Sequence, residues 1–176
     1  MSTKIAVPDL RIRYHGLFDF PGTYASVQTW CKDHGYYWQE EITKHKVPSP
    51  RGAEQETMWS AERWVTDYIN YRIELWNHTW DMTEATVQLK GKKKKLTNAR
   101  VEFWFKGTVT YDWQNIWKGG RLVKWIGGLY DKYIMRRDLE AIYVDGLTYS
   151  MYDLHALVKK NLDMQAKAHE YHGYAR

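Results

Sequence analysis

The chain has 176 residues, of which 44% are hydrophobic and 27% charged, and its formal net charge is +5. This composition argues against disorder, and the length suits one domain that buries roughly 70% of the unfolded chain's surface. Cys31 is the only cysteine, which excludes an intrachain disulfide framework. No apolar run reaches the roughly 20 residues of a membrane helix, and no signal peptide is recognisable. We therefore expect a cytoplasmic protein with no membrane partner.

The N-terminal part of the chain predicts a strand, a helix and a second strand, after a short flexible segment at residues 1–8. Residues Asp9–Phe20 alternate apolar and polar side chains, which is typical of a strand. Apolar residues then recur at helical spacing until Gly35, a residue suited to end a helix. Tyr36–Lys46 predicts the second strand, and the prolines and glycine within Val47–Glu56 predict a loop.

The segment from about Trp59 to Trp80 predicts one long strand, bent or bulged, with two different faces. The odd-numbered positions form a plain apolar face of Val65, Ile69, Tyr71, Ile73 and Leu75. The even-numbered positions carry Trp64, Tyr68, Trp76 and Trp80 among Thr66, Asn70, Arg72, Glu74 and His78. Because alternate side chains of a strand point to opposite sides, large rings are expected on a polar face. Such rings usually indicate that a helix, another subunit or a stacked base covers them.

Two further strands are predicted on either side of a basic turn. Ala85–Leu89 and Val101–Trp113 alternate apolar and polar side chains, and Trp104 again stands on the polar face. Gly91 and the lysines Lys92–Lys95 form the predicted turn between them. A short lysine run of this kind is either a solvated turn or a patch that attracts phosphates.

The C-terminal part of the chain predicts helices. The apolar period becomes helical from Ile116, and Asp145–Gly146 predicts a turn. A final amphipathic helix is expected over about Tyr149–Ala168, followed by a flexible tail at residues 169–176. The whole chain, residues 1–176, is therefore predicted to be a single α+β domain. It should consist of a mainly antiparallel sheet of about five strands packed against two or three helices.

Three features give the chain a resemblance to a group of small uncharacterised archaeal proteins. They are the opening aromatic strand that runs into a Trp-bearing helix, the hairpin Thr86–Lys93 (TVQLKGKK) that ends in Thr97–Asn98, and the amphipathic C-terminal helices. The group has no assigned chemistry, so this resemblance implies the α+β layout alone. The order of elements also resembles the helix-grip fold of lipid- and hormone-binding proteins, in which a curved sheet wraps a long terminal helix. That second resemblance implies an apolar ligand pocket, although a fold does not establish a function.

No catalytic, cofactor or metal motif stands out in the sequence. Cys31 and His34 lie three residues apart on one helix face, which suits two metal ligands, but no second pair completes a four-ligand site. There is no G-x-S-x-G elbow and no phosphate-binding glycine loop. We therefore expect a protein that is not an enzyme and that has no metal and no cofactor.

Three functions remain open at this point. The first is a structural protein that self-associates, or binds a protein partner, through Trp64, Tyr68, Arg72, Trp76, Trp80 and Trp104. The second is a single-stranded nucleic-acid binder that stacks bases on those rings and contacts phosphates through Lys92, Lys93, Lys94 and Lys95. Glu74, Glu102 and Asp112 share the predicted face and would repel phosphates. The third is the helix-grip pocket. The simplest interpretation is that a helix of the same chain covers the aromatic face and that nothing binds there.

Overall fold

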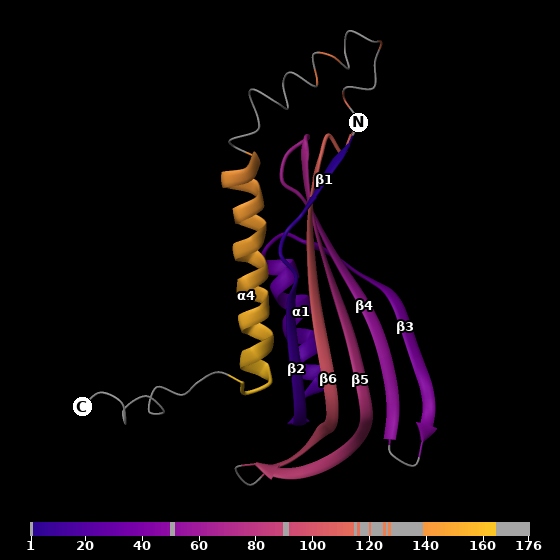
Figure 1. Ribbon diagram of the computed structural model, residues 1–176. Coiled ribbons are helices and arrows are strands. Elements are labelled where there is room, and N and C mark those ends of the chain that lie inside the picture. The colour runs from indigo at the N-terminus through magenta and orange to yellow at the C-terminus, as the bar shows by residue number, and fades with distance from the viewer. Residues whose placement is uncertain are drawn as a thin grey trace, which may run out of the picture.

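Within the residues that it describes, the computed structural model contains a six-stranded antiparallel sheet with helices α1 (Phe20–Asp33) and α4 (Asp145–Asn161) packed against one of its faces (Figure 1). The structure describes residues 2–49, 52–89, 92–114, 116, 120, 125, 127 and 139–164. The predicted α+β class is confirmed, with one strand more than the expected number. Within the described residues, no helix is both long and apolar enough to cross a membrane.

The strands form a meander that is completed by the N-terminus. They are β1 (Thr3–Ala6), β2 (Leu10–Phe18), β3 (Tyr37–Ser49), β4 (Gly52–Trp64), β5 (Ile69–Leu89) and β6 (Lys92–Tyr111). Strands β3 to β6 pair in chain order, and both β1 and β2 pair with the remaining edge of β6. Residues 3–6, which we expected to be flexible, therefore form a strand, because the backbone groups of β6 at residues 108–111 give them partners.

Two α-helices lie on the same side of the sheet (Figure 1). Helix α1 (Phe20–Asp33) begins at Asp19, whose carboxylate accepts a 2.9 Å hydrogen bond from the N–H of Gly22. Helix α4 (Asp145–Asn161) follows a short π-helical segment, η2 (Leu139–Val144). The turn predicted at Asp145–Gly146 is wrong, because these residues begin α4. A Cβ atom at Gly146 would lie 3.2 Å from the hydroxyl of Tyr71, so the glycine serves a close approach of helix and sheet.

The core lies between the helices and the sheet. The buried sheet residues include Ile69, Tyr71, Ile73 and Leu75 of β5 and Val101, Phe103, Phe105, Val109 and Tyr111 of β6. The buried helix residues include Val27, Trp30 and Cys31 of α1 and Leu147, Met151, Leu154 and Val158 of α4. The apolar faces predicted from alternation are therefore confirmed as core. Burial raises the pKa of the Cys31 thiol to about 12, so this cysteine behaves as a small hydrophobic residue.

The single long strand predicted from Trp59 to Trp80 is wrong. It consists of β4 and β5, which are joined by a tight turn at Val65–Tyr68. In this turn the Thr66 hydroxyl accepts backbone N–H hydrogen bonds of 3.2 and 3.0 Å from the residues two and three positions further on. Trp64 pairs with Asn70, so even-numbered residues stay on one face across the turn. This is why the alternation continues through the turn and conceals it.

The predicted loop over Val47–Glu56 is also wrong in extent. Strand β3 continues to Ser49 and β4 begins at Gly52, so most of this segment belongs to a hairpin. A proline is tolerated in β3 because β3 is an edge strand, and Pro48 falls where the register with β4 is interrupted. Most of the helical segment predicted from Ile116 and the tail at residues 169–176 lie outside the described residues.

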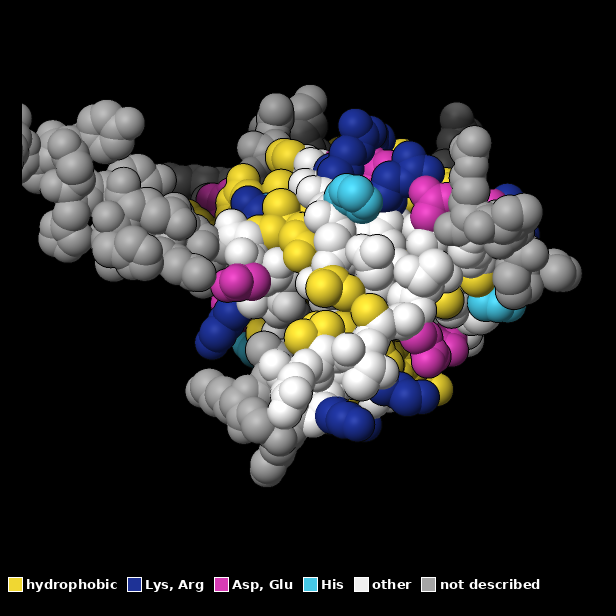
Figure 2. All heavy atoms as spheres, turned by 90° about the horizontal axis from the view of Figure 1, so that it is seen from below, with side chains coloured by type: hydrophobic (Ala, Val, Ile, Leu, Met, Phe, Trp, Pro, Cys, Tyr) yellow, Lys and Arg dark blue, Asp and Glu magenta, His cyan; other side chains and the backbone are white. Residues whose placement is uncertain are grey.

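The far end of the β5–β6 hairpin forms a projection that we call the arm, residues 83–89 and 92–98. Ala85–Leu89, predicted as a separate strand, continues β5, and Lys92–Lys95, predicted as a turn, belong to β6. A register shift between Trp80 and Thr83 separates the arm from the rest of the hairpin. In Figure 1 the arm turns toward the side on which the helices lie. Figure 2 views this end of the molecule and shows lysine and arginine side chains along its margins, with apolar side chains between them.

Asp19 connects the arm to helix α1, and replacing it should destabilise the protein. The Nζ of Lys94 lies 2.8 Å from the Asp19 carboxylate. We expect Asp19→Ala to lower the free energy of unfolding by about 1–2 kcal/mol, through the loss of both the helix cap and the ion pair. Asp19→Asn should lose less, because asparagine also caps helices. Urea unfolding at neutral pH measures both losses, and a wild-type value for Asp19→Ala would contradict the assignment.

The same contacts give the stability contribution of Asp19 a pH dependence. The hydrogen bond from Lys94, followed by that from the Gly22 N–H, lowers the pKa of Asp19 in the folded protein. A carboxylate whose folded pKa is lowered stabilises the fold above its unfolded pKa, which is about 4, and loses this contribution as the pH falls through the folded pKa. The stability difference between wild type and Asp19→Asn should therefore shrink in urea titrations below about pH 4.

Candidate interaction face

The sheet face opposite α1 and α4 has no described helix over it (Figure 1), and we call it the open face. Cross-strand pairing defines its members, because residues directly opposite each other on paired strands share a face. They are the odd-numbered residues of β2 from 11 to 15 and the even-numbered residues of β4 from 54 to 64, of β5 from 70 to 80 and of β6 from 100 to 110. By the same rule the face includes Tyr37, Gln39, Ile42, Lys44 and Lys46 of β3, together with Lys4 and Ala6 of β1. Glu41, at the bulge of β3, also reaches it, because it contacts Arg72.

Five of the six predicted interface residues lie together on this face. They are Trp64, Arg72, Trp76, Trp80 and Trp104, with Trp64 53% and Trp76 37% exposed. Tyr68 does not join them, because it lies in the β4–β5 turn and packs partly against the core. Lys93, Lys94 and Lys95 lie on the arm, beyond the register shift that ends the open face.

Trp104 is in contact with two cationic side chains of its own sheet. It lies directly opposite Trp76 across the β5–β6 ladder. The Cζ of Arg11 and the Nζ of Lys106 lie 4.2 Å and 3.9 Å from the centre of the Trp104 ring. The indole N–H donates a 3.1 Å hydrogen bond to Asp9. The Trp104 ring is therefore fixed in place, with its π-face already occupied by intramolecular contacts.

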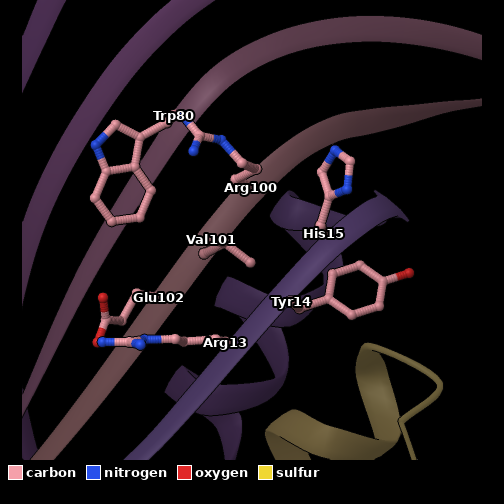
Figure 3. A pocket seen from close by; sticks show the side chains of 7 residues that line it. All are labelled: Arg13, Tyr14, His15, Trp80, Arg100, Val101 and Glu102. Carbon is pink, nitrogen blue, oxygen red and sulfur yellow. The ribbon is translucent and has the colours of Figure 1, made fainter.

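Trp80 is likewise covered by a neighbour, and it borders a hollow in the face. The imidazole of His78 stacks on Trp80 with ring centres 3.9 Å apart. A hollow of about 420 Å³ is lined by Trp80, Arg100, Glu102 and Arg13, among others. Figure 3 shows how these side chains lie. A second hollow of about 320 Å³ adjoins the first, shares Arg13, Trp80 and Glu102 with it, and continues to Trp76. The two hollows form one shallow groove across β2, β6 and β5.

Arg72 links three strands at the other side of the open face. Its guanidinium donates to Glu62 of β4 at 2.6 Å, to Glu74 of β5 at 3.0 Å and also to Glu41 of β3. Partial burial acts to lower the pKa of Arg72, but the hydrogen bond to Glu74 and the charge of Glu41 outweigh it and raise the pKa. Arg72 is therefore a permanent cation that holds three carboxylates in one array.

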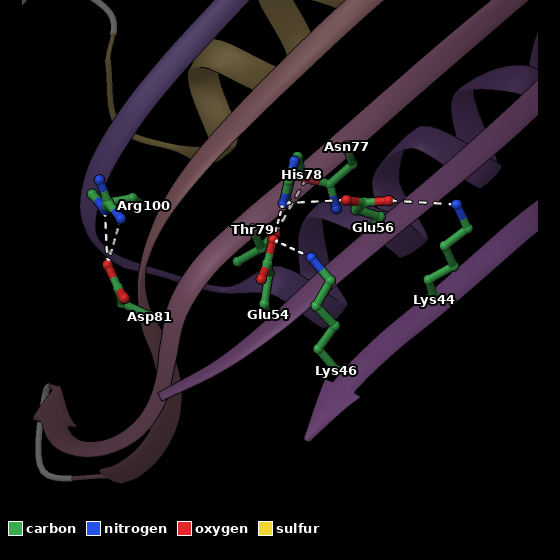
Figure 4. Close-up of polar contacts among 9 residues, drawn as sticks. All are labelled: Lys44, Lys46, Glu54, Glu56, Asn77, His78, Thr79, Asp81 and Arg100. Carbon is green, nitrogen blue, oxygen red and sulfur yellow. Dashed lines mark hydrogen bonds and ion pairs between the residues drawn. The ribbon is translucent and has the colours of Figure 1, made fainter. Parts of the chain in front are cut away.

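A second cluster on β4 and β5 was missed by sequence reasoning because Glu54 and Glu56 fell in the predicted loop. The Nε2 of His78 lies 2.7 Å from Glu54 and 3.6 Å from Glu56 (Figure 4). One ligand atom from each of these residues lies within 4.8 Å of the others, which is close enough to hold a divalent cation. Lys46 and Lys44, however, already pair with Glu54 at 3.0 Å and Glu56 at 3.8 Å. The hydrogen bonds from Lys46 and then from His78 lower the pKa of Glu54, which fixes it as a carboxylate.

Charge is unevenly divided between the two halves of the open face. The half formed by β2 and β6 has four cations, Arg11, Arg13, Arg100 and Lys106, and one carboxylate, Glu102. Two aspartates at its margin, Asp9 and Asp81, contact Trp104 and Arg100. The half formed by β3, β4 and β5 has three cations, Lys44, Lys46 and Arg72, and five carboxylates, Glu41, Glu54, Glu56, Glu62 and Glu74. One half is therefore basic and the other acidic, and the tryptophans lie between and beside them.

Comparisons with known proteins give little further information. No protein family and no curated protein matches the chain. Among solved structures, it is similar to an uncharacterised protein from Rhizobium leguminosarum, with 9% identity over 91% of this chain and 99% of that chain. The TM-score of this match is 0.22, and a likeness at that level carries no argument about fold or function.

Proposed function

We propose that this protein is a non-enzymatic structural protein that self-associates through the open face. The observation that carries the proposal is the division of this aromatic face, over which no described helix lies, into a basic and an acidic half. A two-fold axis that lies in the face and runs along the strands would place the basic half of one copy over the acidic half of the other. Closed two-fold dimers are the commonest oligomers, and tryptophan and arginine are enriched at their interfaces.

The alternative of single-stranded nucleic-acid binding has less support on this face. A base would have to displace Arg11 and Lys106 from Trp104, or His78 from Trp80, before it could stack on either ring. The five carboxylates of the acidic half would also repel a phosphate chain. A second copy would not meet this repulsion, because its own basic half would lie against those carboxylates. The helix-grip pocket stays a prediction.

Trp76→Ala tests the interface at its most accessible central ring. Light scattering coupled to size-exclusion chromatography should give the wild type a mass of twice 21.1 kDa. We expect Trp76→Ala to weaken the dimer at least tenfold, since a central tryptophan in an interface typically contributes about 2 kcal/mol or more. Tyr149→Ala is the matched control, because Tyr149 is 71% exposed on α4, away from the open face. A wild type that stays monomeric at every concentration would exclude self-association.

The same measurement can test whether the charges of the two open faces hold the copies together. Arg13→Glu with Lys106→Glu should make both halves of one variant acidic, so that its copies repel each other. Glu54→Lys with Glu56→Lys should make both halves of a second variant basic, with the same result. Mixing the two variants should restore a dimer, because a face with a net negative charge in both halves then meets a face with a net positive charge in both halves. Two folded variants that stay monomeric after mixing would reject charge-paired contact between the open faces.

A further inference from the structure

The arm is a two-stranded ribbon that extends beyond the rest of the sheet. Pairing of β4 with β5 ends at Ala53–Met82, and pairing of β2 with β6 ends at Phe18–Thr97. Beyond these points, within the described residues, the two strands of the arm pair only with each other as far as Leu89–Lys92. The part of the arm that is only two-stranded, residues 85–89 with 92–96, is therefore roughly 16 Å long at about 3.3 Å per residue.

The two faces of the arm differ in burial and in chemistry. One face carries Ala85, Val87 and Leu96, which are half-buried, and Lys94, which is tied to Asp19. The other, which we call the outer face, carries Thr86 opposite Lys95 and Gln88 opposite Lys93, and all four are exposed. Glu84, near the base of the outer face, lies 3.6 Å from Lys95. Both of these side chains are about 80% exposed, so this ion pair is weak and leaves Lys95 available to a ligand.

We propose that the outer face of the arm binds duplex DNA in the major groove. The major groove of B-form DNA is wide enough to admit a two-stranded β-ribbon. Lysines on such a ribbon reach phosphates, and hydroxyl and amide groups between them can hydrogen-bond to base edges. The outer face offers both kinds of group, Lys93 and Lys95 beside Thr86 and Gln88, on a chain with a net charge of +5.

The shape and chemistry of the arm favour this partner over other nucleic acids. The major groove of an RNA duplex is too deep and narrow for side chains to read. Single strands are bound by stacking on aromatic rings, and none of the four outer-face residues is aromatic. The proposal uses no residue of the open face, so it holds or fails independently of self-association.

Fluorescence anisotropy with a labelled 20-base-pair DNA duplex tests this proposal. We expect wild-type affinity to fall as salt is raised from 50 to 200 mM, because binding releases counterions. Lys93→Gln with Lys95→Gln should weaken binding about tenfold or more and reduce the slope of log affinity against log salt by about 1.8, or 0.9 per lost phosphate contact. Lys32→Gln with Lys160→Gln is the matched control, since it removes two exposed lysines from the C-terminal turns of α1 and α4. Unfolding curves should show that both variants are folded.

Several outcomes would overturn the proposal. One is the absence of duplex binding at 50 mM salt, and another is an equal loss of affinity in the control variant. Equal affinity for an RNA duplex or a single strand of the same length would show that the lysines bind any polyanion, without use of the major groove. Binding to phosphatidylserine vesicles but not to duplex DNA would assign the arm to a membrane surface instead.

Discussion

Phe105→Ala is expected to lower the free energy of unfolding by about 3–5 kcal/mol, the usual cost of removing a buried phenylalanine. Phe105 lies at the centre of β6 with no exposed surface, and its ring meets His155 of α4 edge-on at 5.5 Å. The substitution would leave a cavity between the sheet and α4 that neither element can close without moving. Urea unfolding monitored by circular dichroism gives the measurement.

Trp104→Ala is the matched control for this prediction. Trp104 is the neighbour of Phe105 on β6, but it lies on the open face and is only partly buried. Its loss should cost clearly less than the loss of Phe105 in dilute, monomeric protein, because it removes surface cation–π contacts of about 0.5–1 kcal/mol each and leaves no internal cavity. Equal losses for the two variants would mean that both faces of β6 are core, and would contradict the open face.

Gly107→Ala should destabilise the protein by about 2–3 kcal/mol through overpacking. A Cβ atom at Gly107 would lie 2.3 Å from the Sδ of Met151 and 2.5 Å from a methyl carbon of Val7. Both distances are far below van der Waals contact, so α4 and the segment after β1 would have to move away from β6. Gly120→Ala is the matched control, because a Cβ atom there meets nothing within 4 Å.

A double-mutant cycle separates overpacking from a backbone effect. If Met151 is the obstacle, the loss in Gly107→Ala with Met151→Ala should be smaller than the sum of the two single losses. If the loss in the double variant equals the sum of the two single losses, Gly107→Ala destabilises the protein for a reason other than contact with Met151. Urea unfolding curves of the four proteins give the required free energies of unfolding. Their midpoints can be compared directly when the slope m is the same for all four.

Local patterns in the sequence predicted the composition of each face better than the connections between strands. Alternation in Ile69–Leu75 and Val101–Tyr111 marked the buried face, because a half-buried strand imposes a period of two on its residues. The β4–β5 turn escaped notice because it has no glycine or proline and preserves the alternation on both sides. The lysines at 92–95 were assigned to a turn on composition, whereas their pairing with the end of β5 makes them part of a strand.

The candidate site shows the same limit. Four tryptophans and Arg72 were placed on one face from alternation alone. The partners of Arg72 could not be predicted, because Glu41 and Glu62 come from other strands and reach it only through the register of β3, β4 and β5. The basic half of the face was missed for the same reason. It depends on β2 lying beside β6, where Arg11 is opposite Trp104, a residue 93 positions away in the sequence.

Strand β3 bears on whether the self-association proposed above would stop at two copies. It is an edge strand, and an edge with free backbone groups can add further copies without limit, as in fibres. Irregular register after Glu40, together with Lys44, Lys46 and Pro48 along the strand, opposes such addition, because a bulge, charges and a missing N–H each interrupt a continuous ladder. Contact through the open face, in contrast, uses the same surface on both copies and is complete once two have met. For the proposed self-association, these features favour a closed pair over a polymer.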